Sequence, residues 1–98
     1  MILGLDISTS ITGLAIVDKS GKLLYTDHID TRKEKNIFDK ANKVRASLLE
    51  LKNSNSIEHI FIEQPFTFFN SGGSSAKTMA TLQRFNGMVS WIANEVFK

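Results

Sequence analysis

The chain has 98 residues, with a hydrophobic fraction of 42% and a charged fraction of 22%, as expected for one small globular domain or a piece of one. It has no cysteine, which excludes disulfide bonds, cysteine-ligated zinc and thiol catalysis, and its net charge of +2 is too small to indicate a nucleic-acid partner. No apolar run approaches the roughly 20 residues needed to span a bilayer, and no basic residue precedes the first apolar run, so we expect a cytoplasmic protein without a signal peptide.

Three short strands are predicted in the first third of the chain. Met1–Leu5 is an unbroken apolar run, which is typical of a central strand covered on both faces. A polar turn at Ser8–Ser10 separates it from a second strand over Ile11–Val17, and the turn signal Asp18–Gly21 separates that strand from a third over Leu23–Ile29. Because tight turns join the three strands, we expect an antiparallel meander.

A helix, a fourth strand and a second helix follow. Apolar residues recur at helical spacing between about Asn36 and Lys52, namely at Ile37, Ala41, Val44, Leu48 and Leu51. Ile57–Ile62 is predicted as a strand and, because it is reached through a helix, it should lie parallel to an earlier strand. The second helix is predicted from about Ser74 to Phe97. The pattern therefore predicts a single α/β domain over residues 1–98, with a mixed sheet and the order β-β-β-α-β-α.

Basic residues are concentrated around the first helix. Seven lysines and arginines lie between residues 31 and 53 against three acids, which leaves this segment with a local charge of about +4. The segment is either a solvated helix face or a surface that meets phosphates.

The second helix carries more apolar surface than one contact requires. At 100° per residue its apolar residues cover about 180°, whereas packing against one sheet face needs only a little over ~100°. Ala80, Gly87 and Trp91 lie on the far side. We expect a second contact there, with a partner subunit or further chain, although burial within the same domain is the alternative.

Two acidic residues end predicted strands. Asp6 follows the first apolar run and Glu63 follows the fourth strand, so parallel neighbouring strands would bring both carboxylates to one edge of the sheet, where α/β proteins bind ligands. Adjacent carboxylates repel each other unless a cation or proton lies between them, and Mg²⁺ is commonly held by one or two carboxylates. The alternative for Asp6 is a turn residue bonded to the amides of Ser8–Ser10.

These motifs resemble a known family. The stretch Ile2–Gly13 resembles the first-strand motif of RuvC-type Holliday junction resolvases, and Ile60–Phe66 is similar to their second acidic motif, a glutamate followed by glutamine and soon by an aromatic. Ser74–Val96 is similar to the long helix that follows. The resemblance covers nearly the whole chain and implies a ribonuclease H-like fold that here stops before the family's last strand and final helix.

The resemblance also implies a function, namely two-metal hydrolysis of DNA phosphodiesters in four-way junctions. Asp6 and Glu63 match the family's first two catalytic metal ligands, for Mg²⁺ or Mn²⁺. Homodimerisation through the second helix would use Ala80, Gly87, Met88 and Trp91. The family unstacks junction bases with an aromatic residue, for which the candidates are Phe66 with Phe68 and Phe69. Ordinary core packing is the alternative for these aromatics.

Further DNA contacts are expected at the start of the second helix. Gly72–Ser75, Lys77 and Arg84 could hold a DNA phosphate, with Ser74 presenting a free amide, although glycine and serine before a helix also form a plain cap. His28 and His59 are interpreted as structural or surface residues.

The chain departs from the family in one respect. The resolvases' remaining aspartate pair comes from a later strand and helix, whereas the only acid after Glu63 here is Glu95. We therefore do not expect this chain to be active alone: it is a truncated piece, one half of an enzyme completed by a second polypeptide, or a catalytically inactive relic. Two other functions stay open: a non-catalytic dimerisation or branched-DNA-binding module, and a fragment of an actin-like kinase that binds ATP phosphate at its first turn. Ser8 stands where such kinases usually have glycine.

Overall fold

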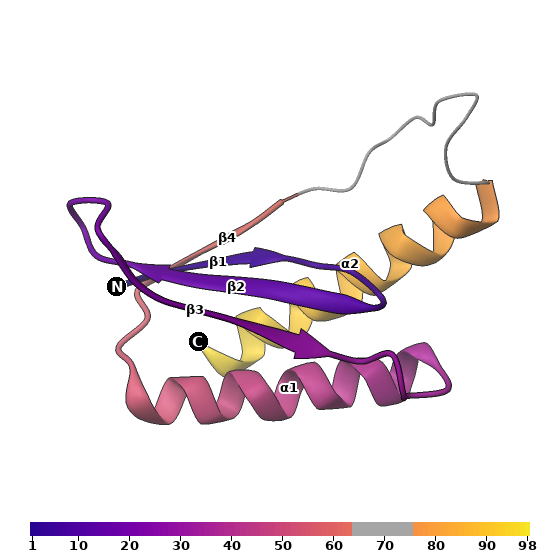
Figure 1. Ribbon diagram of the computed structural model, residues 1–98. Helices are drawn as coiled ribbons and strands as arrows, with labels where there is room; N and C mark the ends of the chain where they lie inside the picture. Colours follow the sequence, from indigo (N-terminus) through magenta and orange to yellow (C-terminus); the bar gives the residue numbers. More distant parts are fainter. Residues whose placement is uncertain (64–75) are drawn as a thin grey trace.

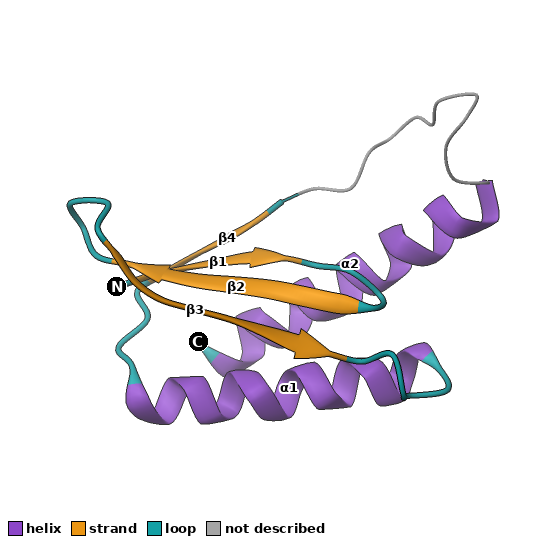
Figure 2. Cartoon of the chain, viewed as in Figure 1, coloured by secondary structure: helices purple, strands orange, loops and turns teal. Residues whose placement is uncertain are grey.

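The structure, a computed structural model, describes residues 1–63 and 76–98 and consists of a four-stranded sheet with two helices on one of its faces (Figure 1). The elements are β1 (Ile2–Asp6), β2 (Ile11–Val17), β3 (Leu23–Asp30), α1 (Ile37–Ser54), β4 (His59–Ile62) and α2 (Ala76–Val96). The strand order is β3-β2-β1-β4, antiparallel except for the parallel β1–β4 pair. The predicted element order and mixed sheet are confirmed (Figure 2).

Element ends differ from the predictions by small shifts. β1 includes Asp6, so the first acidic residue belongs to the strand itself. β4 begins at His59, two residues later than predicted, although the Glu58 backbone N–H still donates to the Met1 carbonyl oxygen at 2.9 Å. The predicted start of the second helix at Ser74 lies outside the described residues.

The hydrophobic core lies between the sheet and the two helices. Alternate residues of β1 and β2 point toward the helices, and α1 buries the stripe predicted from its spacing. The side chains with no exposed surface include Leu3, Ile16, Val44, Leu48, Phe85 and Val89. β3 contributes only Ile29 to this core. Within the described ranges, no helix is long and apolar enough to cross a membrane.

The opposite face of the sheet, which we call the open face, is covered by neither α1 nor α2 (Figure 1). Gly4, Gly13 and Ala15 lie on it, together with Phe61, whose residue surface is 66% exposed. The outer edge of β4 pairs with no other described strand. The prediction that Met1–Leu5 is covered on both faces is therefore wrong for the described residues. Leu3 and Leu5 are buried on the helix side, whereas Gly4 lies on the open face.

Candidate metal-binding and active site

Asp6 and Glu63 come to lie side by side on the open face. In the β1–β4 ladder Leu5 is opposite Ile62, and the Glu63 backbone N–H donates to the Leu5 carbonyl oxygen at 3.3 Å. The same register, continued by one residue, sets Asp6 beside Glu63. Because Leu5 is buried against the helices, its neighbour Asp6 points to the other side of the sheet. Both exposed carboxylates line one shallow groove.

The floor of this groove is made of residues with little or no side chain. Gly13 is the β2 partner of Asp6, and a methyl group placed on it would lie 3.9 Å from the Asp6 Cβ. Gly4 and Ala15 continue the floor along β1 and β2, and Phe61 flanks it on β4. The space beside the Asp6 carboxylate is therefore left open to a ligand.

The donor set fits one hard divalent cation. Mg²⁺ is commonly bound by one or two carboxylates, with waters and substrate phosphate completing its octahedron, and Asp6 and Glu63 supply such a pair. Among residues 1–63 and 76–98, no group of three Asp, Glu, His or Cys side chains could hold a metal ion, and His28 and His59 are exposed on β3 and β4. The described residues therefore fit a single ion better than a two-ion centre.

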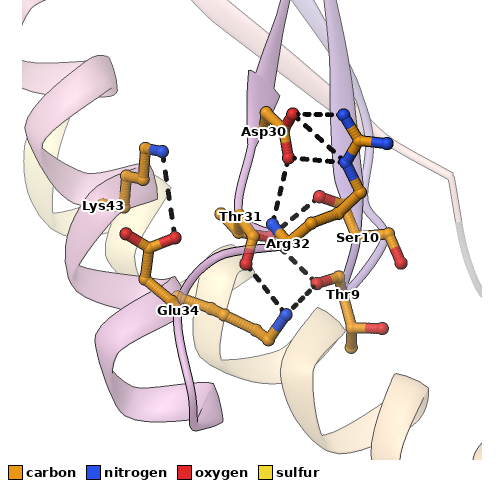
Figure 3. Close-up of polar contacts among 8 residues, drawn as sticks. Thr9, Ser10, Asp30, Thr31, Arg32, Glu34 and Lys43 are labelled. Carbon is orange, nitrogen blue, oxygen red and sulfur yellow. Dashed lines mark hydrogen bonds and ion pairs between the residues drawn. The ribbon is translucent and has the colours of Figure 1, made fainter.

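The turn that follows Asp6 is held in place by partly buried polar contacts. The Thr31 hydroxyl donates to the carbonyl oxygens of Thr9 and Ser10 at 2.9 and 3.1 Å, and the Thr31 backbone N–H donates to Ser10 at 2.8 Å (Figure 3). The Lys40 ammonium donates to the carbonyl oxygens of Thr9 and Thr31 at 2.7 and 3.0 Å. Since backbone carbonyls removed from water need such partners, these bonds fix the turn's path relative to β1.

Replacing Lys40 by Met is expected to lower the free energy of unfolding by about 1–3 kcal/mol, because two backbone carbonyls lose a charged donor. Urea denaturation measures this loss. Lys43→Met is the matched control, since its 3.8 Å ion pair with Glu34 is partly exposed and such pairs contribute about 0–1 kcal/mol. Equal losses in the two variants would contradict a special role for Lys40.

The predicted basic segment is largely engaged within the chain. Arg32 makes a bidentate contact with Asp30, with a shortest N–O distance of 2.7 Å (Figure 3), and this hydrogen bonding holds the pKa of the Asp30 carboxyl well below its usual range. Four of the seven basic residues contact other parts of the chain, namely Arg32, Lys40, Lys43 and Arg45. The interpretation as a structural, solvated face is thus favoured over a phosphate-binding one.

The residues predicted for a dimer contact lie mostly on the exposed side of α2. Ala80 and Gly87 are exposed, and Trp91 is 59% exposed with the Arg45 guanidinium 5.8 Å from its ring centroid. Met88 differs, because it is half-buried and packs against the core. An exposed tryptophan beside an arginine is a composition enriched in protein interfaces.

The residues predicted to contact DNA are only partly described. Phe66, Phe69 and Ser74 lie outside the described residues, so their placement stays a prediction. Lys77 and Arg84 are exposed on the first half of α2.

Sequence reasoning missed Lys40, although the sequence contained a signal for it. Lys40 lies three residues after Ile37 and four before Val44, which places it on the edge of the apolar stripe of α1. A charged residue in such a stripe must find a polar partner when the helix packs, and here the partners are the turn carbonyls beyond Asp6.

Comparison with known proteins supports one fold. No protein-family model and no curated protein matches the chain. A solved structure of T. thermophilus RuvC in complex with a Holliday junction substrate is similar with a TM-score of 0.73 and 21% identity, over 97% of this chain and 58% of that one. A second Thermus thermophilus RuvC structure has a TM-score of 0.68 at the same identity and coverage. The chain thus has a RuvC-like, ribonuclease H-like fold and spans 58% of the length of these RuvC chains.

Proposed function

We propose that this chain, with its RuvC-like fold, is part of a divalent-metal-dependent endonuclease that cleaves branched DNA. The observation that carries this proposal is the placement of Asp6 and Glu63 as neighbours at the carboxyl ends of two parallel strands, in one open groove. Ligands of open α/β sheets bind at this end of the strands. A carboxylate pair in such a position, rather than on a flexible loop, is suited to holding a cation at a fixed point.

Asp6 and Glu63 would hold Mg²⁺ or Mn²⁺, which when bound stabilises charge on a phosphodiester and makes a coordinated water more acidic. The chain itself fixes the positions of the two carboxylates and leaves space beside them. Both carboxylates are fixed by strand pairing, and Gly13 leaves the adjacent floor free for a phosphate to approach. The bonds from Thr31 and Lys40 keep the turn after Asp6 from moving into that space.

The proposed substrate is based on the same similarity to RuvC. The matched T. thermophilus RuvC is in complex with a Holliday junction substrate, and we propose branched DNA of this kind for the present chain. Phe66 and Phe69 would stack on unpaired bases. The exposed side of α2 around Trp91 would form a homodimer contact. We also propose a cytoplasmic location.

Activity should require additional carboxylates. The described residues supply a pair, whereas a two-ion mechanism normally uses more oxygen ligands. The unpaired edge of β4, next to Glu63, is the place where a further strand could add. We propose that a second polypeptide, or further sequence, supplies the remaining ligands there.

The metal site can be tested without any cleavage assay. Titrating the protein with Mn²⁺ should broaden the NMR amide signals of residues 5–6, 13 and 62–63 before others, because the unpaired electrons relax nearby nuclei. Asp6→Asn and Glu63→Gln should each weaken this effect by about 10-fold or more, as loss of one of two charged ligands implies. Glu95→Gln, on the far half of α2, is the control. Unchanged broadening in Asp6→Asn would refute the site.

A second candidate function is a non-catalytic module that binds branched DNA. It is favoured by the lack of a third metal-binding side chain within residues 1–63 and 76–98. Such a module would bind a four-way junction and leave it uncut in Mg²⁺ even when a completing polypeptide is present.

A further inference from the structure

A second cleft lies between the turn after β1 and the first half of α2. Its lining residues are Ser8, Thr9, Lys77, Thr78, Thr81 and Leu82. With a volume of about 370 Å³ it is large enough for a phosphate group and its flanking sugar atoms. Three elements of phosphate recognition meet there, namely a cation, hydroxyl groups and a fixed backbone.

The turn side of the cleft is rigid. The Thr12 hydroxyl donates to the Ser8 carbonyl oxygen at 3.1 Å and accepts from the Ser8 backbone N–H at 3.3 Å. The Thr9 carbonyl oxygen accepts from Lys40 at 2.7 Å and from the Thr31 hydroxyl at 2.9 Å. The Thr9 hydroxyl itself bonds to no other residue within 1–63 and 76–98. It is therefore a hydroxyl on an immobilised backbone with no hydrogen-bond partner among these residues.

The helix side of the cleft is electropositive. Lys77 and Arg84 are the charged residues in the first half of α2 as described, with no acid in its first turn. Lys77 makes no ion pair with any residue in the described ranges. No acidic side chain in the described ranges neutralises Lys77. An anion can therefore bind to Lys77 without displacing an existing ion pair.

We propose that this cleft binds a backbone phosphate of a nucleic-acid strand, adjacent to the phosphodiester held at Asp6 and Glu63. Lys77 provides the charge, and the Ser8 and Thr9 hydroxyls provide hydrogen bonds to non-bridging oxygens, whereas the Thr81 hydroxyl donates to the Lys77 carbonyl oxygen at 3.0 Å. Ser8 follows Asp6 by two residues in the chain, which places the turn side of the cleft near the end of β1. That the bound phosphate lies next to the phosphodiester to be cleaved rests on the proposed function. Phosphate binding by the cleft does not rest on it.

The test is the salt dependence of DNA binding in EDTA, where cleavage cannot occur. Anisotropy of a labelled four-way junction, measured over a range of KCl concentrations, gives the slope of log affinity against log salt. Lys77→Gln is expected to reduce that slope by about 0.9, because the variant neutralises one DNA phosphate fewer than the natural protein. Thr9→Val, which keeps the shape and the carbonyl bonds, is expected to weaken binding about 3- to 10-fold with the slope nearly unchanged.

Lys52→Gln, an exposed lysine in the last turn of α1, is the matched control and should alter the slope much less. An unchanged slope in Lys77→Gln, or an equal change in Lys52→Gln, would overturn the proposal. So would inorganic phosphate shifting the cleft's NMR signals while DNA leaves them unmoved. If Asp6→Asn still cuts but Lys77→Gln lowers the slope, the nuclease assignment fails and the phosphate cleft stands.

Discussion

Changing Asp6 to Asn, or Glu63 to Gln, is expected to lower the rate of four-way junction cleavage by about 10³-fold, while binding of the uncut junction stays within about 2-fold. Each substitution removes a negative ligand from a site that has only two in the described residues. A 10³-fold loss corresponds to about 4 kcal/mol of transition-state stabilisation, which is in the range of a metal's contribution. Both replacements keep the side-chain size, so the β1–β4 ladder should be unaffected.

The measurement is a gel assay of a labelled junction with Mg²⁺ or Mn²⁺, using the chain together with whatever polypeptide completes its activity. Glu95→Gln serves as the control, since its carboxylate lies late in α2 and pairs with Lys98 at 3.8 Å. Full cleavage by either site variant would reject the assignment. Equal loss in all three variants would point to a general charge effect instead.

The proximity of Asp6 and Glu63 could be predicted from the sequence because it depends on topology alone. Asp6 and Glu63 each end an apolar run, and a helical connection between the runs makes the strands parallel, which brings their ends together. Neither step requires knowledge of side-chain packing. The register that makes the two residues direct neighbours, however, is fixed only when Leu3 and Leu5 pack against the helices with Ile60 and Ile62.

The surroundings of the site could not be predicted in the same way. That α1 and α2 share one face of the sheet depends on how their apolar stripes pack against each other. As a consequence Gly4 lies on the open face, although Met1–Leu5 is predicted as a strand covered on both faces. The phosphate cleft joins residues 8 and 9 to residues 77 and 81, a distance along the chain that no local pattern encodes.

The face that carries the site depends on a core built around one aromatic residue, and Phe85→Ala is expected to destabilise the protein by about 3–5 kcal/mol. Phe85 has no exposed surface and is the largest fully buried side chain among the described residues. In a domain of this size such a loss lowers the melting temperature by roughly 15–30 °C, which thermal circular dichroism measures. Phe38→Ala removes the same atoms from an α1 residue that is 66% exposed, and should change stability by less than about 0.5 kcal/mol. If Phe85→Ala and Phe38→Ala had the same melting temperature, α2 would not be packed on α1 and the sheet as described. The cleft between α2 and the β1–β2 turn would then not exist as described.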